Sequence, residues 1–208
     1  MRPIRTVLVT TFALAVLPGC AGSTTGSVAG ERAPTSAQSA SPSGAMSAAG
    51  QALLAKHSFS GRSAVEIIDQ LDRTPVSSRP KDLMASVRPD ELVVSGEGTE
   101  VSLPMPEDRF YLSVAPYVET THECFNHSLT TCKGEMGGED VQVRLVEDGT
   151  GSVVVGDTKT VFDNGFVGLW LPKDMTGTLR ITHGGRTGEV PISTHDDDPT
   201  CLTTLRLT

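Results

Sequence analysis

The feature that most limits the fold of this chain is a series of short alternating segments between Glu91 and the C-terminus. Apolar and polar residues alternate in VQVRLV (141–146), TLRITH (178–183) and TCLTTLRLT (200–208), and turn-forming Gly, Asn and Asp separate such segments. Alternation places apolar side chains on one face of a strand, and several short strands joined by turns are typical of antiparallel sandwiches. We therefore expect a mainly antiparallel, sandwich-like β domain over residues 101–208.

A short amphipathic helix is predicted before these strands. Ser63 is placed to cap it, Glu66 follows three positions later as in a capping box, and Pro75 ends the pattern. A second, weaker helical segment is expected over 79–87. Residues 51–100 should thus form a small helical N-terminal region, and the fold class should be α+β.

The N-terminus has the layout of a secretory signal. Arg2 and Arg5 precede a twelve-residue apolar stretch (6–17), which is too short to be a permanent membrane helix, and LPGC closes it at Cys20. LPGC resembles the bacterial lipobox, whose cysteine is lipidated. We therefore expect a lipoprotein-type signal peptide over 1–19, lipidation of Cys20, and an extracytoplasmic protein that is lipid-anchored to the cell membrane or periplasmic. Ordinary secretion is the alternative.

The segment that follows is a predicted flexible linker over residues 20–50. Ser, Ala, Gly, Thr and Pro make up 25 of the 30 residues from Ala21 to Gly50. Such a segment can bury too little apolar surface to offset the entropy lost when it becomes ordered. A cleaved pro-segment is the other interpretation.

Loss of the two arginines of the signal peptide changes the formal net charge of the protein from −8 to −10. Such an acidic protein is not suited to nucleic acid, and membrane contact is expected through the lipid anchor only.

The segment HECFNHSLTTC (122–132) concentrates the reactive side chains of the chain. It holds two of the four cysteines and two of the five histidines. If Cys20 carries lipid, three cysteines remain, and an odd number indicates either a disulfide with a free thiol or a site that uses three sulfurs. A Cys124–Cys132 disulfide, a zinc site and a copper site are all compatible with this spacing.

The chemistry of the donors favours copper over zinc. The spacing H-x-C-x2-H-x4-C matches no usual zinc finger or ribbon. Thiolates with one or two imidazoles suit Cu(I), which is soft and accepts two or three ligands. Thiolates can also give electrons to Cu(II), at the cost of forming a disulfide. The disulfide and the metal site can therefore be two states of one cluster.

Three separated blocks resemble a known family. YLSVAPYVETTHECFNHSLTTCKGEM (111–136), DNGFVGLWLP (163–172) and HDDDPTCLTTLRL (195–207) are similar to the CueP-type copper-resistance proteins of the bacterial envelope, in the same order. The resemblance covers roughly residues 64–208. At Phe125 the chain departs from the pattern, since some members have a histidine there.

This resemblance implies a site and a function. Cys124, Cys132 and Cys201 correspond to the metal-binding cysteines, and His122 and His127 to histidines beside the first of them. The family implies Cu(II) reduction, Cu(I) held by thiolates, and association as a homodimer. We expect a metal-binding protein, with zinc as a substitute ion, that uses the three cysteines as reductants. It would serve copper resistance or deliver copper to a secreted cuproenzyme.

Two alternatives come from other classes of protein. One is a thiol-disulfide oxidoreductase that cycles through a Cys124–Cys132 bond, although the chain lacks C-x-x-C. The other is a non-catalytic β-sandwich module with a structural disulfide.

Overall fold

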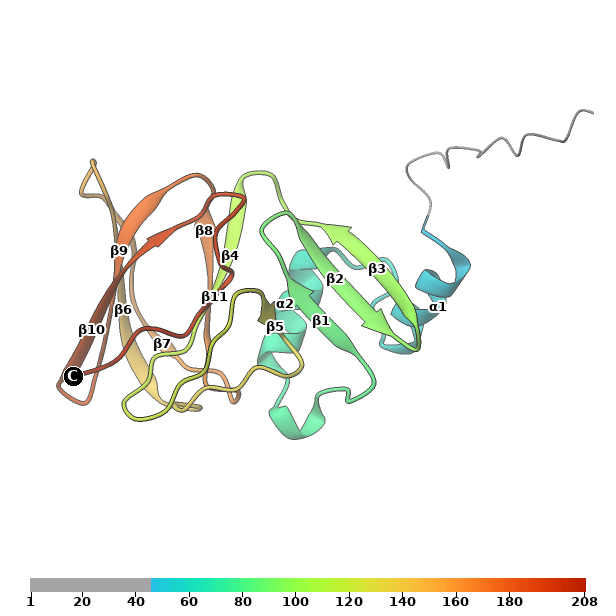
Figure 1. Ribbon diagram of the computed structural model, residues 1–208, viewed down its shortest axis with the longest axis horizontal. Helices are drawn as coiled ribbons and strands as arrows, with labels where there is room; N and C mark the ends of the chain where they lie inside the picture. Colours follow the sequence, from blue (N-terminus) through green and yellow to red (C-terminus); the bar gives the residue numbers. More distant parts are fainter. Residues whose placement is uncertain (1–45) are drawn as a thin grey trace, which may run out of the picture. The chain divides into compact units, whose positions relative to one another are not determined.

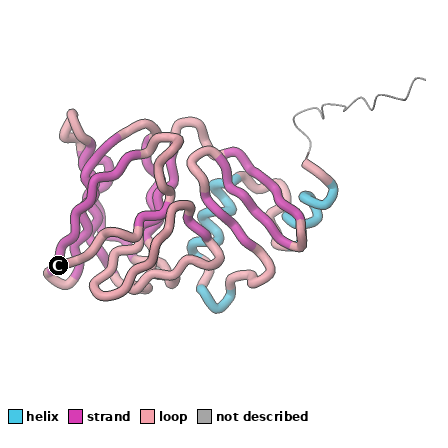
Figure 2. The backbone as a smooth tube through the Cα atoms, in the orientation of Figure 1, coloured by secondary structure: helices cyan, strands magenta, loops and turns pink. Residues whose placement is uncertain are grey.

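The structure, a computed structural model, describes residues 46–208 (Figures 1 and 2). The predicted signal peptide, Cys20 and most of the predicted linker lie outside these residues. The helices are α1 (Ala48–Lys56), α2 (Ala64–Arg73) and the 3-10 helix η1 (Val76–Ser78). The strands are β1 (Met84–Val87), β2 (Glu91–Gly96), β3 (Thr99–Pro104), β4 (Arg109–Val114), β5 (His127–Ser128), β6 (Asp140–Glu147), β7 (Val153–Thr160), β8 (Val167–Pro172), β9 (Thr176–His183), β10 (Arg186–Ser193) and β11 (Cys201–Leu202). Within 46–208, no helix is long and apolar enough to cross a membrane.

Helix α2 forms where the capping pattern predicts it. The Ser63 hydroxyl accepts the Glu66 N–H at 3.4 Å, and the Glu66 carboxylate accepts the Ser63 N–H at 2.8 Å. This reciprocal pair satisfies two backbone donors at the helix N-terminus. The capping box is thus confirmed in full.

Helix α1 begins inside the segment predicted to be linker. Ser47 caps it by accepting the Gly50 N–H at 3.0 Å, and Leu53 and Leu54 are buried. Alanine favours helix, and the two leucines anchor it to the core, so the helix extends back into the Ala-rich sequence. Helix α1 therefore starts before Gly50, within the predicted linker.

The N-terminal half contains a sheet as well as helices. Its strand order is β3-β2-β1-β5, and all neighbours are antiparallel. The helix expected over 79–87 is wrong, because Met84–Val87 is strand β1, with Ala85 and Val87 fully buried. Alternating burial and a four-residue pairing with β2 outweigh the weak helical preference of this short segment. Residues 51–100 therefore carry strands β1 and β2 in addition to their helices.

The C-terminal half is a β sandwich. A four-stranded sheet, β10-β9-β6-β7, faces a three-stranded sheet, β11-β4-β8 (Figure 1). Buried apolar side chains of both sheets form one core between them. Each fully buried leucine or isoleucine in such a core contributes about 1.5–3 kcal/mol. The exception to antiparallel pairing among these strands is β11, which runs parallel to β4. The α+β fold with a mainly antiparallel sandwich is confirmed.

Strand β8 also contacts helix α2. The Trp170 ring packs on Tyr111 with centroids 4.8 Å apart, and its Nε1–H donates to the Asp69 carboxylate at 3.0 Å. Tyr111 belongs to the core formed by the helices and the N-terminal sheet, and the partly buried Trp170 packs against that core. This contact holds helix α2 against the three-stranded sheet, which brings the end of the helix close to the candidate site.

Candidate metal centre

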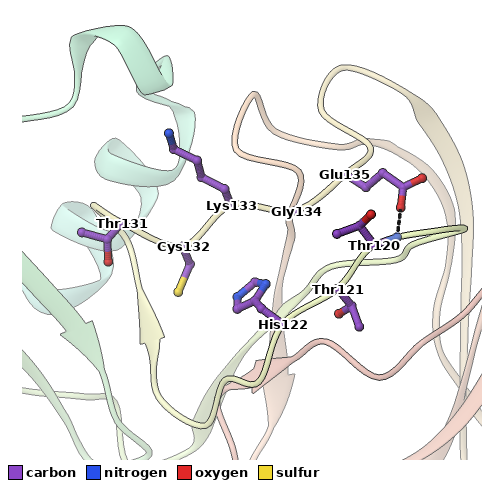
Figure 3. A pocket seen from close by; sticks show the side chains of 8 residues that line it. All are labelled: Thr120, Thr121, His122, Thr131, Cys132, Lys133, Gly134 and Glu135. Carbon is purple, nitrogen blue, oxygen red and sulfur yellow. Dashed lines mark hydrogen bonds between the residues drawn. The ribbon is translucent and has the colours of Figure 1, made fainter.

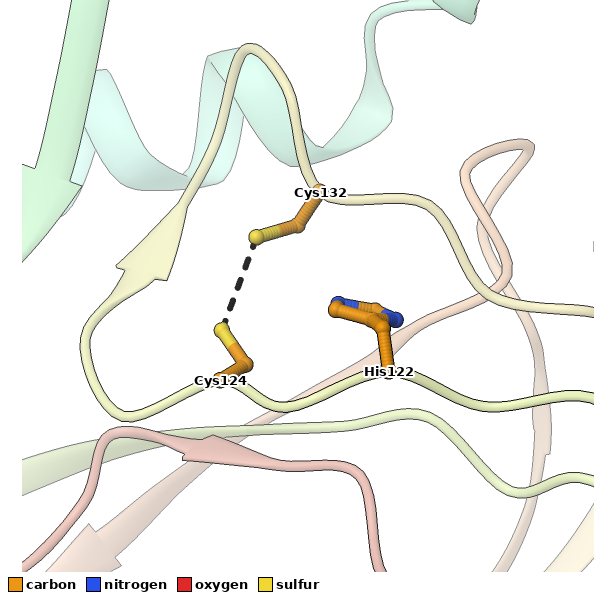
Figure 4. Close-up of side chains that lie close together, drawn as sticks. All are labelled: His122, Cys124 and Cys132. Atoms are coloured by element: carbon orange, nitrogen blue, oxygen red, sulfur yellow. Dashed lines mark hydrogen bonds between the residues drawn. The ribbon is translucent and has the colours of Figure 1, made fainter.

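The segment 122–132 folds back on itself, which brings its two cysteines together. After β4 the chain runs in irregular conformation through Cys124, forms the two-residue strand β5, and turns so that the Cys132 N–H donates to the Ser128 carbonyl at 3.1 Å. The sulfurs of Cys124 and Cys132 are 3.6 Å apart, and His122 points into the same space (Figure 4).

The disulfide joins Cys124 to Cys201, not to Cys132. The two bonded residues are separated by 77 positions, with Cα atoms 5.6 Å apart, and Cys132 is a free thiol. The Cys124–Cys132 pairing considered from the sequence is therefore wrong for this state. The cause is long-range: β11 lies beside β4, and the Cys201 N–H donates to the Phe125 carbonyl at 3.0 Å. Because Cys124 is oxidised, only the Cys132 thiol can donate in the contact between these two sulfurs.

His127 lies on the buried side of this cluster. Strand β5 pairs it with Val87, and its side chain is fully buried. Its Nδ1 is 3.7 Å from the Cys201 sulfur. The Thr200 hydroxyl accepts the His127 N–H at 3.0 Å and donates to the Val87 carbonyl at 2.6 Å. Thr200 thus fixes Cys201 and His127 in one place although 74 positions separate them.

His122 lies on the solvent side. It is exposed, and its ring meets the edge of the buried Phe166 ring with centroids 6.1 Å apart. The same Phe166 ring lies 4.5 Å from the ring of His127. One phenyl group therefore contacts both imidazoles and keeps the inner one away from water.

The donors form two overlapping groups, each with ligand atoms within 4.8 Å of one another. The outer group is His122, Cys124 and Cys132, and the inner group is His127, Cys132 and Cys201. Cys132 belongs to both. The structure thus brings together all five residues of the folded domain that the sequence singled out. While Cys124 and Cys201 form a disulfide they are not thiolates, so the full set of three sulfur ligands requires reduction of that bond.

Charges near Cys132 favour its thiolate. Burial raises the pKa of this thiol. His127, the Ser128 N–H and the Arg79 guanidinium together lower the pKa by more than burial raises it, so the net pKa is below the usual thiol value. For His127, burial lowers the pKa, while Asp72 and Cys132 raise it, and the net shift is upward. A thiol with lowered pKa at a half-buried position is suited to bind a soft metal ion.

An open cavity of about 580 Å³ leads to the outer group (Figure 3). His122 and Cys132 line it together with Glu135. The Glu135 carboxylate accepts the N–H groups of three successive residues at 3.2, 3.0 and 2.9 Å, namely Val118, Glu119 and Thr120. These bonds lower the pKa of Glu135. Its carboxylate therefore holds the backbone that leads to His122 and does not contact an imidazole.

Sequence reasoning did not identify the residues that support the site. Asp72, Arg79, Thr200 and Phe166 are all buried around the cysteines and histidines. One signal was available for Asp72: it lies four positions after the buried Ile68, which puts a carboxylate on the apolar face of helix α2. Thr200 directly precedes Cys201 in the sequence, but no local pattern indicated its contact with His127, and none indicated Phe166 as a neighbour of the cluster.

Comparison with known proteins places the chain in a family. The family model described as "Periplasmic copper-binding protein CueP" matches residues 66–206. The chain belongs to the CueP family. A crystal structure described as "Crystal Structure of S.CueP" is similar at 41% identity and a TM-score of 0.73, over 79% of this chain and 100% of that one. No curated protein matches the chain.

Membership of the CueP family confirms the resemblance on which the expected function rests. The family is one of periplasmic copper-binding proteins, which supports an extracytoplasmic location and copper ions as the cargo of this chain. The Cys and His groups described above fit such a cargo, because thiolate and imidazole are the ligands that copper prefers in proteins.

Proposed function

We propose that this protein captures copper in the cell envelope and reduces Cu(II) to Cu(I) with its own thiolates. The observation that carries the proposal is that three sulfurs and two imidazoles form two overlapping groups, an outer and a mostly buried inner one, which share Cys132. An exposed imidazole offers Cu(II) a first ligand, and a buried, sulfur-rich position suits the softer Cu(I).

The electron balance follows from the disulfide. The thiolates of Cys124 and Cys201 each give one electron, a sulfur–sulfur bond forms between them, and two Cu(II) ions become two Cu(I) ions. The thiol protons leave to solvent when the thiolates form. Cys132, which lies outside the bond, stays available with His122 and His127 to hold Cu(I). A thiol donor of the envelope would restore the reduced state.

The wider role belongs to the same proposal. Lipidation of Cys20 would keep the protein at the membrane through the lipid anchor only, and the 20–50 linker would let the folded domain reach soluble partners. The bound Cu(I) would be sequestered for copper resistance or passed to a secreted cuproenzyme. Association as a homodimer, and zinc as a substitute ion, are part of this account.

A competition measurement tests the proposal. The reduced protein is titrated anaerobically with Cu(I) in the presence of a chromophoric Cu(I) chelator, and the triple variant with Cys124, Cys132 and Cys201 changed to serine is treated alike. We expect the wild type to withdraw Cu(I) from the chelator and the triple variant not to. The matched control is Cys20→Ser, which removes a cysteine outside the site and should bind as the wild type does. Equal binding by the triple variant would rule out the site.

One observation favours a second function, thiol-disulfide exchange. Cys132 has a lowered pKa and lies 3.6 Å from a disulfide sulfur, as an exchanging thiol would. Under this alternative the protein would reduce or isomerise a disulfide substrate in the absence of metal. Turnover of a disulfide-bonded peptide by the metal-free protein would support the exchange function.

A further inference from the structure

Helix α2 places a buried carboxylate behind the inner histidine. Asp72 lies in the last turn of the helix and is 2% exposed, and the His127 side chain is fully buried. The Asp72 Oδ1 atom is 3.8 Å from the His127 Nε2 atom. The two residues come from different elements, α2 and β5, so their approach is a tertiary feature of the fold.

Neither of these two atoms has another partner. Among the described residues, Asp72 Oδ1 and His127 Nε2 are both buried and make no hydrogen bond within normal limits. Leaving a buried carboxylate oxygen and a buried ring nitrogen unpaired is unfavourable, because each has lost its hydrogen bonds to water. Their separation is longer than a hydrogen bond, but such bonds are often long before the ligand binds and shorten in the complex. Each atom is therefore available as a partner of the other.

The opposite nitrogen of the same ring faces the sulfurs. His127 Nδ1 is 3.7 Å from the Cys201 sulfur, and the inner group also includes Cys132. A neutral imidazole carries its proton on one nitrogen and a lone pair on the other. If Nε2 carries the proton and donates it to Asp72, the Nδ1 lone pair points at the position that a metal ion would share with the sulfurs.

The position of Asp72 in its helix indicates a role other than helix stability. A negative charge in the last turn is unfavourable, because the C-terminal end of a helix is the negative end of its dipole. The buried Arg79 guanidinium, which donates to the Asp72 carbonyl at 3.2 Å, supplies the compensating positive charge. The carboxylate is thus kept inside the protein with the help of a buried cation, next to a residue of the inner group.

We propose that Asp72 is a positioning residue of the copper site, which holds the His127 ring with its proton on Nε2 so that Nδ1 is directed at the sulfurs. This inference deepens the proposed function and, in its copper-binding part, rests on it. A carboxylate behind a ligating histidine raises the basicity of the ring and fixes its tautomer, and its loss commonly lowers metal affinity about 10- to 100-fold.

The first test needs no copper. The ring nitrogens of ¹⁵N-labelled histidine in the reduced, metal-free full-length protein are observed by NMR at a pH where the rings are neutral, and His127→Asn assigns its signals. We expect the His127 proton on Nε2 in the wild type and a mixture of tautomers in Asp72→Asn. A wild-type proton on Nδ1 would overturn the proposal, whether or not the protein binds copper.

The second test measures Cu(I) affinity in a double-mutant cycle. Asp72→Ala should weaken binding about 10- to 100-fold in the wild-type background and have no further effect in a His127→Ala background, because Asp72 acts through that ring. The matched control is Asp69→Ala, which removes from the same helix the carboxylate that accepts the Trp170 Nε1–H, and it should change affinity less than twofold. Equal losses in both backgrounds would show that Asp72 is merely structural. A wild type that fails to bind Cu(I) would instead contradict the proposed function and leave the tautomer result standing.

Discussion

The sulfur of Cys132 lies 3.6 Å from that of Cys124, although Cys124 is bonded to Cys201. One free thiol thus sits beside a disulfide whose two halves are 77 residues apart. This arrangement allows the three sulfurs to exchange partners or to act together as ligands once the bond is reduced. Which pair is oxidised is therefore the first property to test.

Removal of Cys201 should move the disulfide. In Cys201→Ser we expect Cys124 to bond to Cys132, because their sulfurs are already in contact and only a small backbone shift is required. Peptide mapping by mass spectrometry under non-reducing conditions identifies the bond. The same mapping of the wild type should yield Cys124–Cys201 and an alkylated Cys132. A wild-type protein with Cys124 bonded to Cys132 would contradict the structure.

The thiol of Cys132 should ionise below the usual range for cysteine, which is about 8.5. Burial raises its pKa, and His127 is the strongest influence in the opposite direction. In His127→Ala the strongest influence that lowers the Cys132 pKa is gone while the effect of burial remains, so the Cys132 pKa should rise. The rate of alkylation by iodoacetamide against pH, measured on the oxidised protein, reports this pKa.

The control for that measurement is His122→Ala, which removes the exposed imidazole instead of the buried one. It should leave the alkylation profile unchanged, since His122 has no part in lowering the Cys132 pKa. Identical profiles for the wild type and His127→Ala would mean that the inner imidazole does not influence the thiol.

Glu135 should stabilise the folded protein at neutral pH and not in acid. Hydrogen bonds from three backbone N–H groups lower its pKa in the folded state, so its contribution is present above the pKa of the unfolded chain, about 4.3, and is lost as the pH falls through the lower folded value. Glu135→Gln should cost about 1 kcal/mol or less at pH 7, since solvent screens this carboxylate. Urea unfolding at pH 7 and pH 3 measures the difference.

Glu119→Gln is the comparison for this variant. Glu119 is an exposed carboxylate of the same loop, and its substitution should change the free energy of unfolding little at either pH. If Glu135→Gln and Glu119→Gln behave alike, the three backbone hydrogen bonds contribute nothing measurable.

Local patterns in the sequence predicted the elements whose cause is local. The capping pair Ser63 and Glu66 identified helix α2, and alternation identified strands such as β6 and β9. The prediction of a weak helix over 79–87 was wrong because pairing with strand β2, and not the local sequence, decides the conformation of this segment. The start of helix α1 was missed because its anchors, Leu53 and Leu54, lie beyond the low-complexity stretch.

In the candidate site, too, the sequence predicted what has a local cause and not what depends on distant parts of the chain. Four of its five donors could be named because Cys and His are rare in the chain and cluster in the segment 122–132, and Cys201 because the odd number of cysteines pointed to a partner outside that segment. Their pairing could not, because Cys124 and Cys201 are 77 positions apart and are brought together by the long-range pairing of β11 with β4. The supporting residues were missed for that reason too: Thr200 reaches Val87 over 113 positions, a contact without any local signal.

The central claim, that thiolates reduce and then hold copper, is tested most directly by anaerobic addition of Cu(II) to the fully reduced Cys20→Ser protein. Free thiols and chelatable Cu(I) are followed together, and the disulfide formed is then mapped. The account predicts that two thiols are lost for every two Cu(I) ions that appear, that Cys124 and Cys201 form the bond, and that Cys132 remains reduced. Tight Cu(II) binding with no loss of thiols and no Cu(I) would contradict it.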